Sequence, residues 1–137
     1  MQTVVISGYF DPIHVGHLEY IQKAKCLLPE GKLVVIVNSD HQAKLKKGHS
    51  FMPEDERLQI VKAIRWVDQA VISVDQDRTV RETLKIIRPN FFCNGGDQNN
   101  DTIPERDICL ELGIQLVDGL GNKIQSSSWL IKNNLHR

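Results

Sequence analysis

Short apolar runs recur along this chain and constrain its fold more than any other feature. Thr3–Ser7 reads Thr-Val-Val-Ile-Ser and Leu33–Val37 reads Leu-Val-Val-Ile-Val, so neither run contains a charged residue. Continuous apolar runs of this kind are typical of strands that are buried on both faces of a parallel sheet. Amphipathic, helix-like segments follow the runs, and this alternation predicts an α/β fold.

The alternation predicts five strands and five helices. The predicted strands are Thr3–Ser7, Leu33–Val37, Gln69–Val74, Asn90–Cys93 and Ile114–Val117. The predicted helices are Gly16–Leu28, a helix that begins at Pro53, then Thr79–Ile87, Ile103–Leu112 and about Ser127–Leu135. Residues Asn38–Met52 are predicted to be a polar, lysine-bearing loop. With right-handed crossovers these elements give one doubly wound, Rossmann-like parallel sheet, and residues 1–137 are predicted to form a single domain.

The overall composition argues against several classes of protein. The 137 residues carry a formal net charge of zero, so no global field attracts nucleic acid or an anionic membrane. The longest apolar run, Leu33–Val37, is too short to span a bilayer, and the N-terminus enters a strand without a signal peptide. Cys26, Cys93 and Cys109 form no Cys-x-x-Cys pair. We therefore expect a cytoplasmic protein without a disulfide framework or a zinc site.

The loop after the first predicted strand holds the most unusual residues. It reads Gly8-Tyr9-Phe10-Asp11-Pro12-Ile13-His14-Val15-Gly16-His17. In doubly wound sheets, ligands bind at the carboxyl ends of the strands, so we expect a site built from the loops after strands one, two, four and five. His14 and His17 stand at a helix start, where unpaired amides and the helix dipole attract anions, and Gly16 leaves room for a ligand. Two imidazoles there favour a triphosphate site, although their spacing alone also fits surface or capping histidines.

This run resembles the signature of the cytidylyltransferase-like nucleotidyltransferase superfamily, which ends in His-x-Gly-His. The resemblance continues over nearly the whole chain. The later segments that are similar to the adenylyltransferase domain of ADP-heptose synthases are Asn38-Ser39-Asp40 with the lysines after it, Pro53–Arg57, Asn94-Gly95-Gly96-Asp97 and Ser126-Ser127-Ser128. Glycerol-3-phosphate cytidylyltransferases are similar in plan, but their second and fourth loops match less well.

The resemblance implies an enzyme that moves a nucleoside monophosphate from an NTP, with ATP favoured, to a phosphorylated sugar or a related phosphate acceptor. The acceptor's own phosphate oxygen attacks the α-phosphorus, and pyrophosphate leaves without a covalent enzyme intermediate. His14 and His17 are expected to bind the α- and β-phosphates, and a lysine of the second loop is expected to reach them. The candidate lysines are Lys44, Lys46 and Lys47, and the alternative for each is a solvated basic loop.

Further residues are expected at the nucleotide on the strength of the same resemblance. These nucleotide-binding candidates are Tyr9, Phe10, Asp11, Gly16, Arg57, Asn94, Gly95, Gly96, Asp97, Ser126, Ser127 and Ser128. Asp11 either orients its loop or helps to hold the Mg²⁺ that accompanies the NTP. The alternatives are a surface salt bridge for Arg57, a plain turn for Gly95–Asp97 and a helix cap for Ser126–Ser128.

Several positions depart from the family pattern, and they leave the substrate open. Asn94 replaces the family's lysine, Tyr9 stands where threonine or valine is usual, and Asn122–Ser128 differs from the family's last motif. A CTP-dependent cytidylyltransferase of glycerol-3-phosphate or another polyol or head-group phosphate is therefore the close alternative. A non-catalytic nucleotide-binding module is the second.

The same observations bear on binding partners and on one further class of enzyme. A dinucleotide oxidoreductase is not favoured, because no Gly-x-Gly-x-x-Gly follows the first strand. We expect small-molecule substrates and no nucleic-acid or membrane partner. The family resemblance implies a homodimer.

Overall fold

The sheet is built from five parallel strands, and the computed structural model describes residues 1–95 and 103–120. The strands are β1 (Thr3–Gly8), β2 (Lys32–Val37), β3 (Gln69–Ile72), β4 (Phe91–Gly95) and β5 (Gln115–Leu120). Their order is β3-β2-β1-β4-β5, and every neighbouring pair is parallel. The chain therefore winds outward from β1 in both directions, which confirms the predicted doubly wound topology and places its switch point between β1 and β4.

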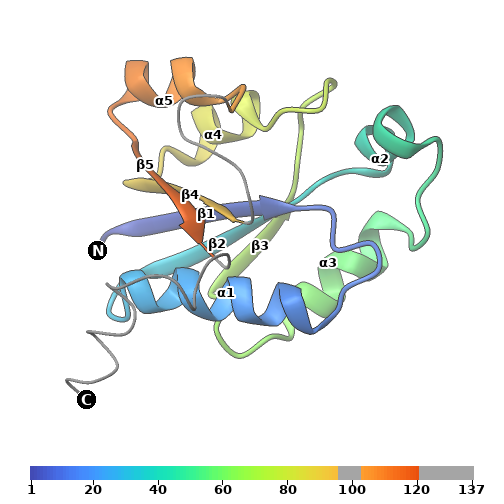
Figure 1. The fold of residues 1–137 in the computed structure, drawn as a ribbon, viewed down its shortest axis with the longest axis horizontal. Coiled ribbons are helices and arrows are strands. Elements are labelled where there is room, and N and C mark those ends of the chain that lie inside the picture. Colours follow the sequence, from blue (N-terminus) through green and yellow to red (C-terminus); the bar gives the residue numbers. More distant parts are fainter. Residues whose placement is uncertain (96–102, 121–137) are drawn as a thin grey trace.

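Helices cover both faces of the sheet (Figure 1). The helices α1 (Val15–Leu27) and α3 (Glu54–Lys62) lie on one face, and α4 (Arg81–Ile87) and α5 (Arg106–Leu112) lie on the other. Alternate residues of the central strands enter opposite cores: Val35 packs on the α1 and α3 side, and Val34 packs on the α4 and α5 side. This alternation explains why the first two strands read as continuous apolar runs.

Element boundaries agree closely with the sequence pattern at several points. The helix expected to stop before Pro89 ends at Ile87, followed by Arg88 in a left-handed conformation. Within the part of the chain that the structure describes, no helix is long and apolar enough to cross a bilayer. Cys26, Cys93 and Cys109 are free thiols. The predicted helix Ser127–Leu135 lies outside the described residues.

The prediction of a loop over Asn38–Met52 was wrong, because this segment contains the helix α2 (Asp40–Lys47). Ser39 caps its start: the Ser39 hydroxyl accepts from the Gln42 amide at 3.1 Å, and the Gln42 side chain accepts from the Ser39 amide at 3.0 Å. Gly48 ends it with a φ of 90°. Strong caps at both ends therefore offset the low hydrophobicity of a lysine-rich segment.

Helix α2 is expected to depend on Gly48. A Cβ at this position would meet no atom within 4 Å, so alanine is sterically permitted but is strained by the positive φ of 90°. We predict that Gly48→Ala lowers the free energy of unfolding by about 1 kcal/mol in urea titrations. Gly48→Asn is the matched control and should lose less, because asparagine tolerates the left-handed conformation. Equal losses for both variants would contradict this explanation.

Candidate active site

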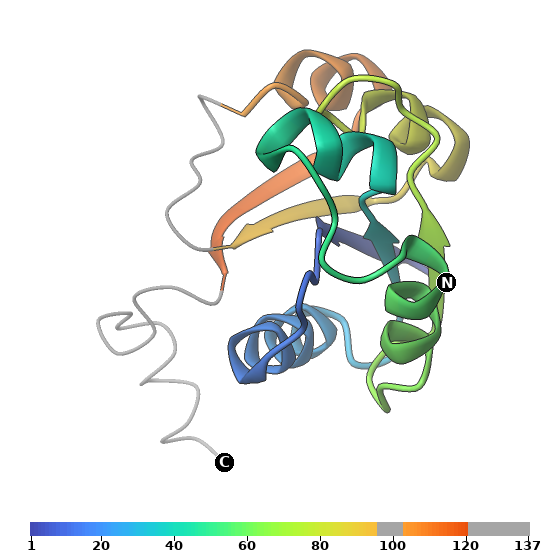
Figure 2. The same cartoon turned by 90° about the vertical axis from the view of Figure 1, so that its right-hand side faces the viewer.

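A pocket of about 900 Å³ lies at the carboxyl edge of the sheet, over the switch point between β1 and β4. Figure 2 views the molecule from that edge, with α2 in the foreground. One wall comes from the loop between β1 and α1, which ends at His14, and from the first turn of α1, which contains His17. The opposite wall comes from Arg78 and Thr79, which precede α4, and from Pro104 and Glu105, which precede α5. The described pocket therefore brings together both faces of the fold.

His14 and His17 form a reciprocal cap on the start of α1. The Gly16 amide donates to Nδ1 of His14 at 3.1 Å, and the His14 amide donates to Nδ1 of His17 at 3.0 Å. The two ring centroids are 4.0 Å apart. Because each Nδ1 accepts a backbone hydrogen bond, the neutral tautomer carries its proton on Nε2 in both rings. The pair thus offers two Nε2–H donors in the pocket, beside the positive end of a helix dipole.

His17 is held in a neutral state by its surroundings. Burial, and secondarily the nearby charge of His14, lowers the pKa of His17 to about 4. Phe10 belongs to this environment: the residue is only 1% exposed, and its ring centroid is 5.0 Å from that of His17. The structure thus gives Phe10 a supporting position under His17. Gly8 makes this possible, because a Cβ there would approach Phe10 Cζ to 3.0 Å.

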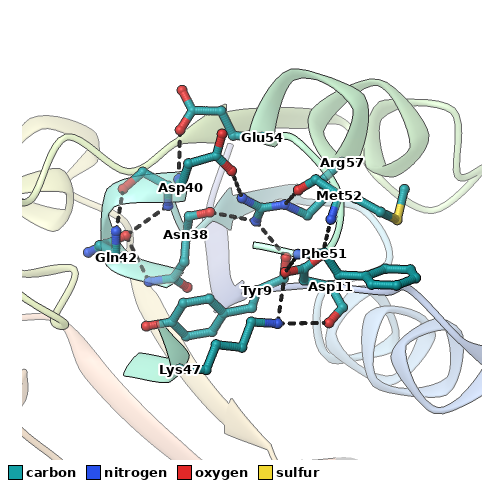
Figure 3. A network of polar contacts seen from close by, with 11 residues as sticks. Tyr9, Asp11, Asn38, Asp40, Gln42, Lys47, Phe51, Met52, Glu54 and Arg57 are labelled. Atoms are coloured by element: carbon teal, nitrogen blue, oxygen red, sulfur yellow. Dashed lines mark hydrogen bonds and ion pairs between the residues drawn. The ribbon is translucent and has the colours of Figure 1, made fainter. Parts of the chain in front are cut away.

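Asp11 organises the loop between α2 and α3 (Figure 3). Its fully buried carboxylate forms an ion pair with Lys47 at 2.7 Å and accepts from the amides of Phe51 and Met52 at 2.8 and 2.6 Å. Burial alone would raise the pKa of Asp11, but these hydrogen bonds outweigh it and hold the pKa below its usual value. Of its two predicted roles, this geometry favours orienting the loop. Among residues 1–95 and 103–120, no cluster of His, Cys, Asp or Glu side chains could hold a metal ion.

Arg57 is buried rather than exposed in the pocket. Its guanidinium Nη1 donates to the carbonyls of Tyr9 and Asn38 at 2.8 and 2.6 Å, and Nε donates to the carbonyl of Met52 at 2.9 Å. Its Nη2 pairs with Asp40 at 2.7 Å. Figure 3 shows how these bonds join the loops that follow β1 and β2. The residue is neither a surface salt bridge nor part of the pocket lining that the structure describes.

The three candidate lysines have different positions. Lys46 and Lys47 line the pocket, whereas Lys44 is exposed and is not among the described residues that line it. Lys46 places its Nζ 4.5 Å from the centroid of the Tyr9 ring, a cation–π contact. Lys47 is paired with Asp11. The structure therefore favours Lys46 and Lys47 over Lys44 as neighbours of a bound ligand.

The remaining candidates divide between the pocket and undescribed segments. Tyr9, Gly16 and the buried Asn94 line the pocket, and Gly95 ends β4. The candidates Gly96, Asp97, Ser126, Ser127 and Ser128 lie outside the described residues.

The sequence prediction missed the loop after β3. Arg78 and Thr79 belong to this loop and line the pocket, as do Tyr20 and Glu105 from other elements. A long-range contact holds this loop at the pocket: the side-chain amide of Gln42, on α2, donates to the carbonyls of Asp77 and Thr79 at 2.7 and 2.8 Å. The carboxyl-end rule for parallel sheets includes this loop, so an arginine just after the third strand was the available signal.

Fold and site together define a class: a Rossmann-like α/β protein with a pocket at its topological switch point. The cytidylyltransferase-like family matches residues 5–123. This chain belongs to that family of nucleotidyltransferases.

Individual relatives are similar to different extents. The chain is 38% identical over 127 residues to the bifunctional protein HldE of Syntrophotalea carbinolica, covering 86% of this chain but only 25% of that protein. It is 34% identical over 117 residues to the FAD synthase of Pyrococcus abyssi, covering 83% of this chain and 77% of that protein. The crystal structure of a lipopolysaccharide core biosynthesis protein from Thermoplasma volcanium has a TM-score of 0.70 at 25% identity, covering 86% of this chain and 95% of that one.

The low pKa of His17 predicts a pH-dependent stability. The pKa of His17 is 6.5 in the unfolded chain and about 4 in the folded protein. Between these two pH values, the unfolded chain binds a proton on His17 that the folded protein does not bind. Stability from this group is therefore complete above the unfolded pKa and is lost as the pH falls through this window. We predict that His17→Asn, whose side-chain oxygen can still accept from the His14 amide, reduces the stability difference between about pH 7 and about pH 5.

Urea midpoints at the two pH values measure this effect. His49→Asn, which removes an exposed loop histidine, is the control and should keep the wild-type difference. A His17→Asn protein with an unchanged pH dependence would show that His17 is not held neutral in the folded state.

Proposed function

We propose that this chain transfers a nucleoside monophosphate from an NTP, with ATP favoured, to a phosphorylated sugar or a related phosphate acceptor, releasing pyrophosphate. The observation that carries the proposal is the paired Nε2–H donors of His14 and His17 at the amino end of α1, inside the switch-point pocket. Such a place suits a triphosphate, because helix dipole and imidazole donors act on the same group.

The proposed reaction is a direct displacement at the α-phosphorus. An oxygen of the acceptor phosphate forms the new bond, the bond from the α-phosphorus to the bridging oxygen breaks, and pyrophosphate takes up the electron pair. The attacking phosphate oxygen is already ionised at neutral pH, so no general base is needed. Neutral His17, together with the adjacent His14, then donates hydrogen bonds to oxygens whose negative charge grows in the transition state.

Cationic side chains complete the proposed site for the phosphates of the two reactants. Lys46 lies on the pocket wall above Tyr9, and Lys47 is anchored by Asp11 within the same lining. Mg²⁺ belongs to the proposal as the counter-ion that the NTP brings, held mainly by phosphate oxygens. Asp11 is not assigned to it, because both carboxylate oxygens are already occupied by Lys47, Phe51 and Met52.

The relatives support ATP as the donor and leave the acceptor class broad. The matched FAD synthase is named for a product that joins a flavin mononucleotide to AMP, and the chain covers most of its length. The match covers only 25% of the HldE protein, so the activity of that whole protein is not proposed for this chain. CTP-dependent transfer to glycerol-3-phosphate or another head-group phosphate is the alternative. A cytoplasmic location and a homodimer remain predictions. Light scattering would measure the oligomeric state in solution.

Pyrophosphate release tests the proposal. Each NTP is combined with sugar 1-phosphates, polyol phosphates, head-group phosphates and flavin mononucleotide. We expect release with at least one pair, and a fall of about a hundredfold or more in His17→Asn, which keeps the cap acceptor but removes the Nε2–H donor. His49→Asn should retain full turnover. A non-catalytic module would bind an NTP in thermal-shift assays yet release no pyrophosphate with any acceptor.

Gly16 supplies an independent variant. A Cβ at position 16 would lie 2.9 Å from Cε1 and 3.1 Å from Nδ1 of His14, so the imidazole must move. We predict that Gly16→Ala lowers turnover by about tenfold to a hundredfold, because the donor is displaced from the reacting group. Its urea midpoint should change little, because the helix preference of alanine over glycine offsets the weakened cap at His14. Unchanged turnover would remove His14 from the mechanism.

A further inference from the structure

Two cationic side chains converge on Tyr9 from different elements of the pocket. Lys46 of α2 lies over the ring at 4.5 Å, and Arg78, from the loop before α4, interacts with the Tyr9 hydroxyl. All three residues line the pocket. Among residues 1–95 and 103–120, the structure forms no ion pair between Arg78 and a carboxylate, so its charge is not neutralised there.

The backbone on both sides of Arg78 is firmly held. The fully buried Gln42 donates to the carbonyls of Asp77 and Thr79, the two neighbours of Arg78. The Asp77 carboxylate accepts from the Thr79 amide and hydroxyl at 2.9 and 2.7 Å. Because Gln42 belongs to the same helix as Lys46, the two cations are carried by one hydrogen-bonded unit. Arg78 is an exposed side chain on an anchored loop, which is the arrangement of a preorganised ligand contact.

The displacement requires two anionic reactants in one pocket. The His14 and His17 donors and the start of α1 serve the NTP on one wall, and Arg78 belongs to the opposite wall, on the α4 and α5 side. In-line attack places the nucleophile and the leaving pyrophosphate on opposite sides of the α-phosphorus. A second cationic site across the pocket therefore fits the attacking phosphate. Arginine suits this task, because its planar fork binds a phosphate monoester through two parallel hydrogen bonds.

We propose that Arg78, together with Lys46 beside Tyr9, binds the phosphate of the acceptor and holds its oxygen ready for attack. This inference rests on the proposed function and narrows it to acceptors that present a terminal phosphate monoester. Tyr9 adds a hydroxyl to the same site, and burial raises the pKa of Tyr9 against the opposing effects of Arg78 and Arg57, so the hydroxyl keeps its proton.

Calorimetric titration of the full chain tests the assignment without a known acceptor. The protein is first saturated with the magnesium complex of α,β-methylene-ATP, or of the CTP analogue if that binds better, which cannot undergo the transfer. Inorganic phosphate is then titrated into the complex. We expect Arg78→Gln to weaken phosphate binding by about tenfold or more and analogue binding by less than about twofold. Arg78→Lys keeps the charge but lacks the planar guanidinium, so its affinity for phosphate should lie between those of the wild type and Arg78→Gln.

Arg65→Gln is the matched control. It removes the same charge from an exposed arginine that also lies beside an aromatic ring, Trp66 at 5.9 Å, just before β3 and so at the opposite edge of the sheet. It should leave both affinities unchanged. The assignment is overturned if Arg78→Gln weakens the analogue instead of phosphate, if it changes neither, or if the wild-type complex binds no phosphate. Failure of the proposed function is a separate result: no analogue bound by the wild type, or no pyrophosphate released in the acceptor panel.

Discussion

The buried guanidinium of Arg57 fixes the relative positions of the segments that build the site. It donates to the carbonyls of Tyr9, Asn38 and Met52 and pairs with Asp40, so it joins the loop after β1, the loop after β2 and the approach to α3. A buried charge without such partners would be strongly unfavourable, and each carbonyl would lose its own partner if Arg57 were absent. The loop that leads to His14 and the helix that carries Lys46 therefore have one common anchor.

Within this frame, the histidine motif gains a structural explanation for its spacing. His14 is the residue that caps α1, and His17 lies one turn later, where its Nδ1 can accept the His14 amide. The same hydrogen bonds that end the loop and start the helix also fix which ring nitrogen holds the proton. Gly16 lies between them because a Cβ would collide with the His14 ring. Capping, the alternative that the sequence left open for these histidines, is thus part of the arrangement that places them in the pocket lining.

The sequence predicted the sheet well because central parallel strands carry their evidence locally, in continuous apolar runs such as Leu33–Val37. Helix α2 was missed for the opposite reason: its charged, lysine-rich composition contains little apolar pattern, and the caps at Ser39 and Gly48 decide its limits. Arg57, expected at the nucleotide, is buried, whereas Arg78, for which the sequence suggested no role, lines the pocket. Whether an arginine is buried against carbonyls or points into a pocket depends on contacts far along the chain, from Tyr9 and Asn38 for one and from Gln42 for the other. The arginines themselves are visible in the sequence, but which role each one takes leaves no local signal.

The two walls of the pocket are attached to the fold in different ways, and this difference bears on how one chemistry could serve several acceptors. On the α1 side, the histidines are fixed by backbone hydrogen bonds that the helix itself requires. On the α4 and α5 side, Arg78 and Glu105 extend from loops; Glu105 accepts from the Val80 amide at 3.0 Å, and burial raises its pKa. Substitutions at Arg78 would alter the pocket without disturbing the cap on α1. A net charge of zero is compatible with this division, since the cations that matter act locally, within one pocket, rather than through a field of the whole protein.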